Sequence, residues 1–147
     1  LPTQGDLCQL HAFVNKGIED PSTLGKYKRV QNYIGDVYTT SHLFVEERMN
    51  SLLRWIKKAY REVDDFEVAF QSHAQFEVIH PFIDGNGRVG RLLLNWLLLY
   101  KKLAPLIITA DKRAEYIASL EHARRRKIDA LCKFCCDCYL KQYQIVC

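Results

Sequence analysis

The stretch from Arg88 to Lys101 constrains the fold more than any other part of the sequence. Between its basic ends it is apolar nearly all round, and a helix with that pattern lies in the interior of a domain. Its longest apolar run, Leu92 to Tyr100, is far shorter than the roughly 20 residues that a membrane-spanning helix needs. We therefore expect one central buried helix surrounded by other helices, and no membrane partner.

Apolar residues recur at helical spacing in several further segments. We expect a short helix around residues 7–14, longer ones over 45–60 and 66–77, one from 111 to about 125, and a last one from about 128. The third of these ends before Pro81. In the helix after Asp111, the residues expected to face inward are Ala114, Ile117, Ala118 and Leu120.

The remaining segment, from Gly25 to Tyr38, alternates in polarity around Gly35-Asp36, which predicts a small β-hairpin. The chain has 147 residues and no linker, so we expect one domain over 1–147. Charged residues are 26% and hydrophobic ones 48% of the chain, which argues against disorder. The predicted class is all-α with a small hairpin.

Four of the six cysteines, Cys132, Cys135, Cys136 and Cys138, crowd into seven residues. A zinc site is one interpretation, but such sites usually use two separated pairs of ligands. The spacing instead favours a helical stripe of reduced, packed thiols, which suits an intracellular setting. The basic run Arg124 to Lys127 favours a solvated helix end over a nucleic-acid patch, and the net charge of +4 is too mild to indicate nucleic acid.

The segment from His80 to Arg91 carries the chemistry. It reads His-Pro-Phe-Ile-Asp-Gly-Asn-Gly-Arg-Val-Gly-Arg, so a Gly-Asn-Gly turn stands where the central helix begins. Free N–H groups and the positive end of the helix dipole make such a turn an anion site suited to phosphate. Arg88 and Arg91 project from nearly the same face toward it. Asp84 is an oxygen ligand suited to Mg²⁺, and His80 can take a proton from a hydroxyl.

A base, a metal ligand, an anion site and two arginines together indicate transfer from a nucleoside triphosphate. The simpler interpretation is a capped loop, in which Asp84 and Asn86 only stabilise the turn and the arginines are surface charges. The number of chemically distinct positions in the run favours the first interpretation. The run is not a Walker A loop, because no Gly-Lys-Ser/Thr follows the glycines.

The run resembles the signature of the Fic family of nucleotidyl transferases, His-x-Phe-x-Asp/Glu-Gly-Asn-Gly-Arg-x-x-Arg, and fills each of its positions. The segment from Gly25 to Ile34 is similar to the family's flap, although Tyr27-Lys28 stands where Tyr/Phe-Arg is usual. The segments before and after the motif extend the resemblance to nearly the whole chain. It implies an all-α Fic domain with the flap at about 25–38 and the signature loop at 80–91.

The resemblance also implies a role for each site residue. His80 is the implied general base, and Asp84 is the implied Mg²⁺ ligand. The implied flap would pair with an extended segment of a target protein by β-addition. The implied phosphate and nucleotide contacts are Gly85, Asn86, Gly87, Arg88, Arg91 and Tyr116, and the implied flap contacts are Tyr27, Lys28, Arg29 and Val30.

The implied activity is AMP transfer from Mg·ATP to a Ser, Thr or Tyr hydroxyl of a target protein. Transfer of UMP or phosphocholine on the same scaffold, and an idle phosphate-binding or interaction module, are the alternatives. Relatives that use ATP often carry Tyr-Tyr and a later Asn near the adenine, whereas this chain has Tyr116-Ile117 and Arg124. ATP stays the expected donor, with Ile117 as an apolar wall. The expected location is the cytoplasm, or a host cytosol for a delivered toxin or effector.

Many Fic proteins also carry an inhibitory pattern, Ser/Thr-x-x-x-Glu-Gly/Asn, whose Glu pairs with the second motif arginine. No Glu of this chain stands in that pattern. We therefore expect Arg91 to be free of an internal carboxylate and the chain to be active as it stands. Three options remain for the inhibitor: a segment upstream of Leu1, a separate antitoxin protein as partner, or none, as in an unrestrained effector.

Overall fold

The computed structural model describes residues 1–125 and 127–144. Within them lie six α-helices and a two-stranded antiparallel sheet, so the predicted all-α class with a small hairpin is confirmed. None of the helices in these ranges is long and apolar enough to cross a bilayer. The elements, in chain order, are α1 (Gln4–Asn15), β1 (Tyr33–Ile34), β2 (Val37–Tyr38), the 3₁₀ turn η1 (His42–Phe44), α2 (Val45–Ala59), α3 (Asp65–Ile79), α4 (Asn86–Tyr100), the 3₁₀ turn η2 (Ala110–Lys112), α5 (Arg113–Arg124) and α6 (Ile128–Gln142).

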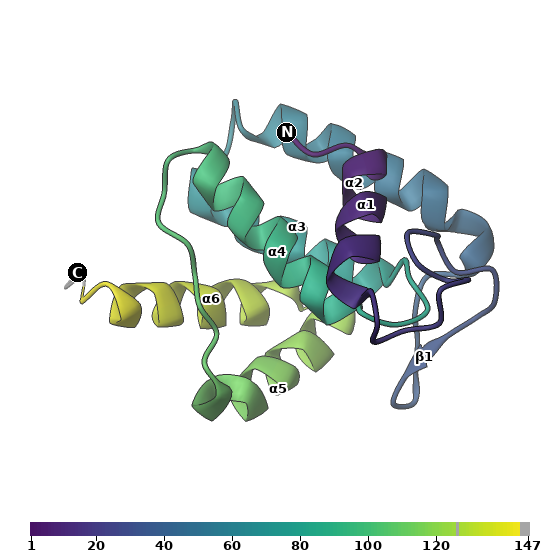
Figure 1. The fold of residues 1–147 in the computed structure, drawn as a ribbon. Coiled ribbons are helices and arrows are strands. Elements are labelled where there is room, and N and C mark those ends of the chain that lie inside the picture. Colours follow the sequence, from purple (N-terminus) through teal and green to yellow (C-terminus); the bar gives the residue numbers. More distant parts are fainter. Residues whose placement is uncertain (126, 145–147) are drawn as a thin grey trace.

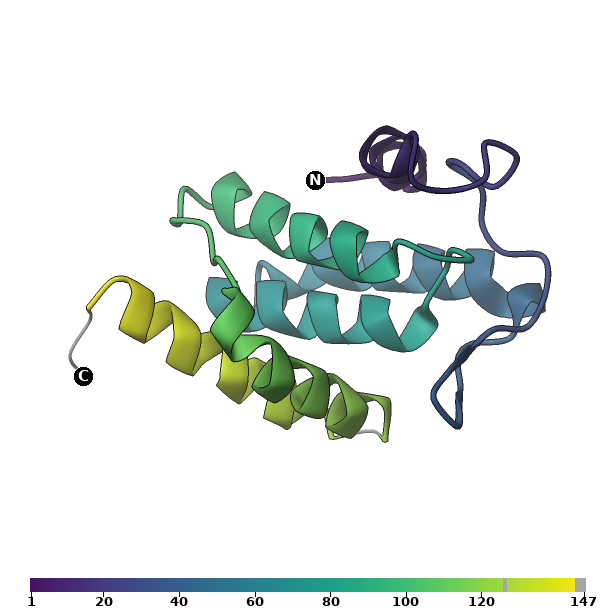
Figure 2. The ribbon, with the colours of Figure 1, turned by 60° about the horizontal axis from the view of Figure 1, so that its bottom comes forward.

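The centre of the molecule is α3, which packs against α2, α4, α5 and α6 (Figure 1). In Figure 2, α2, α3 and α4 run lengthwise beside one another, whereas α1 is seen end-on and so crosses α4 at a steep angle. The α5–α6 pair lies on the other side of this layer from α1. The short hairpin stands at the end where α3 is followed by α4, next to the motif loop.

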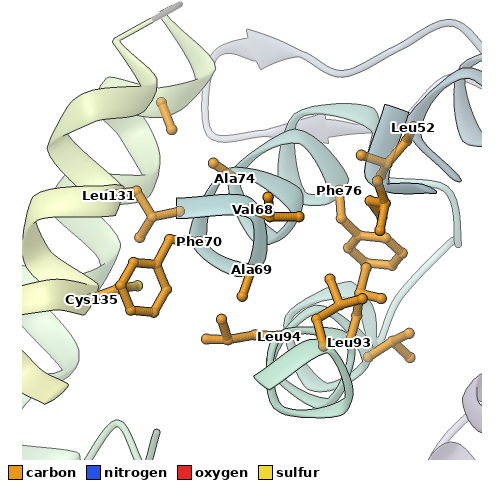
Figure 3. Close-up of a cluster of buried hydrophobic side chains, with 14 of the residues drawn as sticks. Leu52, Val68, Ala69, Phe70, Ala74, Phe76, Leu93, Leu94, Leu131 and Cys135 are labelled. Atoms are coloured by element: carbon orange, nitrogen blue, oxygen red, sulfur yellow. The ribbon is translucent and has the colours of Figure 1, made fainter. Parts of the chain in front are cut away.

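The core lies on both sides of α3 (Figure 3). On one side, Phe76 points toward Leu52 of α2 and Leu93 of α4, and on the other, Phe70 lies against Leu131 and Cys135 of α6. All of these side chains are buried. Full burial of a Leu or Phe contributes roughly 1.5–3 kcal/mol, so these contacts fix α3 among its neighbours.

The helix ends follow from local side-chain chemistry. Thr3 and Asp6 form a reciprocal capping box at the start of α1. Asp64 accepts hydrogen bonds from the N–H groups of Phe66 and Glu67 at the start of α3. At the other end of α3, His80 adopts a left-handed conformation with a φ of 52°, and Pro81 follows. The chain therefore turns sharply at the predicted general base.

Two expectations about buried faces are wrong in detail. The central helix α4 buries Val89, Leu93, Leu94, Leu97 and Leu98 but exposes Leu92, Leu99 and Tyr100, because the crossing helix α1 covers only part of its outer side. In α5, Leu120 is buried as expected, but Ala114, Ile117 and Ala118 are exposed. The buried residues there are Tyr116, Ser119, Leu120 and Ala123.

The strand prediction holds only for the tip of the hairpin. Tyr33 pairs with Tyr38 and Ile34 with Val37, whereas residues 26–32 form no strand. The side chains of this segment are used for attachment instead. Lys28 donates its backbone N–H to Pro81 O at 2.9 Å, and Asn32 Nδ2 donates to Phe82 O at 2.9 Å. The base of the flap is thereby hydrogen-bonded to the motif loop.

Candidate active site

The motif loop is braced from within by Asn86. Its Nδ2 donates to Phe82 O at 2.9 Å, and its Oδ1 accepts from Phe82 N at 2.9 Å. Phe82 is fully buried, with its ring stacked on His11 at 3.9 Å between centroids. The loop is therefore anchored in the core at one residue and closed by a reciprocal pair of hydrogen bonds four residues apart.

The residues of the predicted anion site lie at the start of α4. Gly85, with a φ of 72°, is the residue before the helix, a conformation that favours glycine. The N–H groups of Asn86, Gly87 and Arg88 belong to the first turn, where no intrahelical partner exists. Within the described ranges, no hydrogen bond to protein uses them. Three amides at a positive helix end form a cradle for a phosphate oxygen.

His80 stands beside this loop as a neutral imidazole. Burial, together with the charges of Arg124 and Lys28, lowers its pKa to about 4. Its Nδ1 is buried and has no hydrogen-bond partner among the described residues. An unprotonated imidazole is the state that a proton acceptor needs at neutral pH.

The second motif arginine, Arg91, faces Tyr116 of α5. Its guanidinium carbon is 5.8 Å from the centre of the Tyr116 ring. Within the described ranges Arg91 takes part in no ion pair, although its charge acts on the buried carboxyl of Glu77. Both residues line a pocket of about 210 Å³, whose other walls are Ile108, Thr109, Ala110, Arg113 and Ile117.

Tyr116 is held in place by a histidine of α3. The hydroxyl of Tyr116 is 3.0 Å from His73 Nε2, and the two rings are nearly parallel, at 4°. Burial and the charge of Arg91 lower the pKa of His73 to about 3, so its ring is neutral when it shares this hydrogen bond with the tyrosine hydroxyl. His73 therefore packs on Tyr116 and is hydrogen-bonded to it, and it is not placed as a second base.

A buried carboxyl, Glu77, lies under the same part of the site. Only 1% of it is exposed, and its Oε1 has no hydrogen-bond partner among the described residues. Burial raises its pKa to about 7, against the opposing charges of Arg124 and Arg91. The sequence predicts no role for Glu77, because this acid stands among apolar residues of a helix and belongs to no motif.

The flap residues divide into two groups. Tyr27 packs on Phe82 at 5.4 Å, and Lys28 is 3% exposed, with its Nζ bonded to Asn32 Oδ1 and Thr39 Oγ1 at 2.6 Å each. Both therefore support the flap from inside. Arg29 and Val30 are exposed. Of the four predicted flap contacts, Arg29 and Val30 are the two whose side chains are exposed to solvent.

The Cys cluster occupies one helix, as predicted. In α6, Cys135 is buried, Cys132 and Cys138 are half-buried and Cys136 is exposed, and all four are free thiols. No group of three or more His, Cys, Asp or Glu residues that could hold a metal occurs in the described part of the chain.

The basic run Arg124 to Lys127 is solvated only in part. Arg125 and Lys127 are exposed, as expected of a solvated helix end, but Arg124 is half-buried beside Glu77 and His80. Arg126 lies outside the described residues.

Asp84 is the candidate metal ligand. Its side chain is exposed, with Oδ1 accepting from Gly85 N at 2.6 Å, and it lies on the same turn as the amide cradle. Mg²⁺ is typically bound through one or two carboxylates and the phosphates of a substrate. A single exposed carboxylate beside a phosphate cradle fits that requirement.

Comparisons with known proteins agree on one family. Residues 2–98 match the profile of the Fic/DOC family. The chain is 34% identical over 119 residues to protein adenylyltransferase fic-1 of Caenorhabditis elegans, covering 80% of this chain and 23% of that protein. It is 31% identical over 137 residues to protein adenylyltransferase Fic of Nematostella vectensis, covering 92% of this chain and 32% of that protein.

The solved structures show the same likeness in three dimensions. A structure of C. elegans Fic-1 (residues 134–508) superposes with a TM-score of 0.87 at 28% identity, over 97% of this chain and 42% of that one. A Fic domain-containing signalling protein of Bacteroides thetaiotaomicron shares the fold, with a TM-score of 0.82 at 22% identity. The chain spans about a quarter to a third of the length of the curated relatives it matches.

Proposed function

The chain belongs to the Fic/DOC family, and on that premise we propose that it is a protein adenylyltransferase, which moves AMP from Mg·ATP to a Ser, Thr or Tyr hydroxyl of a target protein. The observation that carries this proposal is the neutral, half-buried His80 placed at the turn between α3 and the amide cradle of α4. The curated relatives that the chain resembles are named as adenylyltransferases.

The chemistry follows from these groups. His80 takes the proton of the target hydroxyl while its oxygen attacks the α-phosphorus of ATP. The bond from the α-phosphorus to the α,β-bridging oxygen breaks, and pyrophosphate leaves. The amides of Asn86, Gly87 and Arg88 hold the oxygen on which negative charge grows.

The remaining site residues bind and orient. Arg88 and Arg91 neutralise the phosphates through charge-assisted hydrogen bonds. Asp84 would hold Mg²⁺, which would supply positive charge to the phosphates and the leaving pyrophosphate. Tyr116 and Ile117, beside Arg91 in the 210 Å³ pocket, offer an aromatic face and an apolar wall to the nucleoside.

The target is held at the flap. The free edges of β1 and β2 offer an extended segment of a second protein a strand to pair with, and the exposed Arg29 and Val30 offer it side-chain contacts. The base of this flap is bonded to Pro81 and Phe82, directly after His80. A hydroxyl on the paired segment therefore approaches the site next to the proton acceptor.

The position of the label within ATP tests the reaction. The chain is incubated with Mg²⁺ and ATP radiolabelled either at the α-phosphate or at the γ-phosphate, alone and with a cell lysate. AMP transfer places label on protein only from α-labelled ATP. Label from γ-labelled ATP would indicate a kinase, and absence of label from both would favour an idle phosphate-binding module.

A further inference from the structure

The first motif arginine has a carboxylate partner that lies far from it in sequence. Arg88 Nη2 is 3.2 Å from Glu19 Oε1. The Glu19 side chain is only 7% exposed, whereas that of Arg88 is 32% exposed. The acid is therefore the buried, fixed member of the pair, and the guanidinium is the member that can still contact a ligand.

Glu19 is fixed by the end of α1. Its N–H donates to Asn15 O at 3.1 Å, and Asn15, fully buried, donates Nδ2 to His11 O at 2.9 Å. Glu19 Oε1 also lies against the motif loop, because a β-carbon on Gly85 would come within 2.6 Å of it. Glu19 therefore lies against both Gly85, which precedes the amide cradle, and Arg88, three residues later.

His11 completes this arrangement. Gly25 N donates to His11 Nδ1 at 3.0 Å, so the ring proton is on Nε2. That nitrogen is 3.1 Å from Asp84 O and 3.6 Å from Glu19 Oε2. One oxygen of Glu19 therefore faces a ring N–H and the other faces the guanidinium, which leaves the carboxylate little freedom to turn.

We propose that Glu19 is a positioning residue for phosphate binding, which holds one amino group of Arg88 so that the rest of the guanidinium stays beside the amide cradle. Arginine presents five N–H donors in a rigid fork, so a carboxylate on one side leaves donors for a phosphate on the other. This inference rests on the proposed function. It assigns Glu19 to substrate binding rather than to blockade of the site.

The test measures the dissociation constant of Mg·ATP by calorimetry and, in parallel, kcat and KM of label transfer. Glu19→Gln keeps the shape and loses the charge, and we expect the dissociation constant and KM to rise about tenfold, as loss of one hydrogen bond to a charged group allows. We expect kcat at saturating ATP to change little. Glu62→Gln, which removes an exposed carboxylate paired with Lys58 at 4.0 Å, is the matched control and should change neither constant.

Two further variants separate positioning from stability. In an Arg88→Ala background, Glu19→Gln should weaken ATP binding no further. Arg88→Lys, which leaves Glu19 in place, should also weaken binding, because one ammonium cannot contact the carboxylate and a phosphate together. This second variant keeps the test decisive if Glu19→Gln does not fold.

Three results would overturn the proposal. Tighter ATP binding by Glu19→Gln would mark Glu19 as a competitor of the phosphate, and a lower melting temperature of Glu19→Gln with an unchanged dissociation constant would mark Glu19 as structural only. The third is an affinity of Arg88→Lys for Mg·ATP equal to that of the wild type. Because binding is measured apart from transfer, failure of the proposed function is distinguishable. A wild-type chain that binds Mg·ATP and labels no protein refutes AMP transfer alone, and one that binds no nucleotide refutes both.

Discussion

Glu77 Oε1 lies so close to the backbone of Gly90 that a β-carbon at position 90 would overlap it. The same β-carbon would lie 3.1 Å from two ring atoms of His73. Gly90 is inside α4, where glycine costs about 1 kcal/mol relative to alanine. The glycine between the two motif arginines therefore makes room for a buried carboxyl and a buried imidazole of α3.

Gly90→Ala should consequently destabilise the chain, by about 1–3 kcal/mol in the free energy of unfolding, because the overlap outweighs the helix propensity gained. Urea denaturation measures the change. In a Glu77→Ala background the overlap with the carboxyl is gone, so the same substitution should cost much less.

Gly5→Ala in α1 is the matched control. Its β-carbon would lie 3.6 Å from Thr3 Oγ1, an ordinary contact, so it should stabilise the chain by up to about 1 kcal/mol. If Gly90→Ala were as stabilising as Gly5→Ala, that result would contradict the close packing of α3 on α4 at Gly90.

The low pKa of His80 predicts the pH dependence of transfer. A histidine whose pKa is lowered to about 4 keeps its neutral, proton-accepting form as the pH falls through the ordinary value of about 6.5. In a Glu77→Gln variant, which removes the buried carboxyl whose pKa is about 7, kcat/KM at saturating Mg²⁺ should therefore show no inflection near pH 6.5 and should decline only toward more acidic pH. Loss of half the activity near pH 6.5 in that variant would mean that His80 titrates as an exposed histidine.

The nucleotide pocket predicts a purine donor. Tyr116 is fixed by His73, and Ile117 is 41% exposed on the same pocket, so a broad apolar base can pack there. We expect titrations of transfer against ATP, GTP, CTP and UTP to give the highest kcat/KM for ATP. A clear preference for a pyrimidine nucleotide would contradict the AMP assignment and favour the alternative of UMP transfer.

The motif loop could be predicted from sequence because its geometry is local. Gly85, Asn86 and Arg88 are neighbours in the chain, and the turn and the helix start follow from glycine conformation and the missing intrahelical partners of the first turn. The pairing of Glu19 with Arg88 could not be predicted, since the two residues are 69 positions apart and no spacing pattern connects them.

Long-range contacts also explain the errors in the helices and the flap. The hydrophobic pattern of α5 placed Ile117 inside, but Tyr116, bonded to His73 of α3, is the buried residue, and Ile117 lines a pocket. The alternation near Tyr27 resembled a strand, but Lys28 bonds to Pro81 through its backbone instead of to a neighbouring strand. The hydrophobic periodicity of a segment identifies its apolar residues, but contacts with the rest of the fold determine which of these residues are buried.

The central claim is that His80 accepts the proton of a target hydroxyl during AMP transfer. Intact-protein mass spectrometry of a labelled target, or of the chain itself, compares the wild type with His80→Ala at equal occupancy by Mg·ATP. We expect the wild type to add the mass of one AMP residue to a Ser, Thr or Tyr. We expect His80→Ala to be slower by about 10²–10⁴ while its dissociation constant for Mg·ATP stays near the wild-type value. Near-normal addition of AMP by His80→Ala would contradict this account.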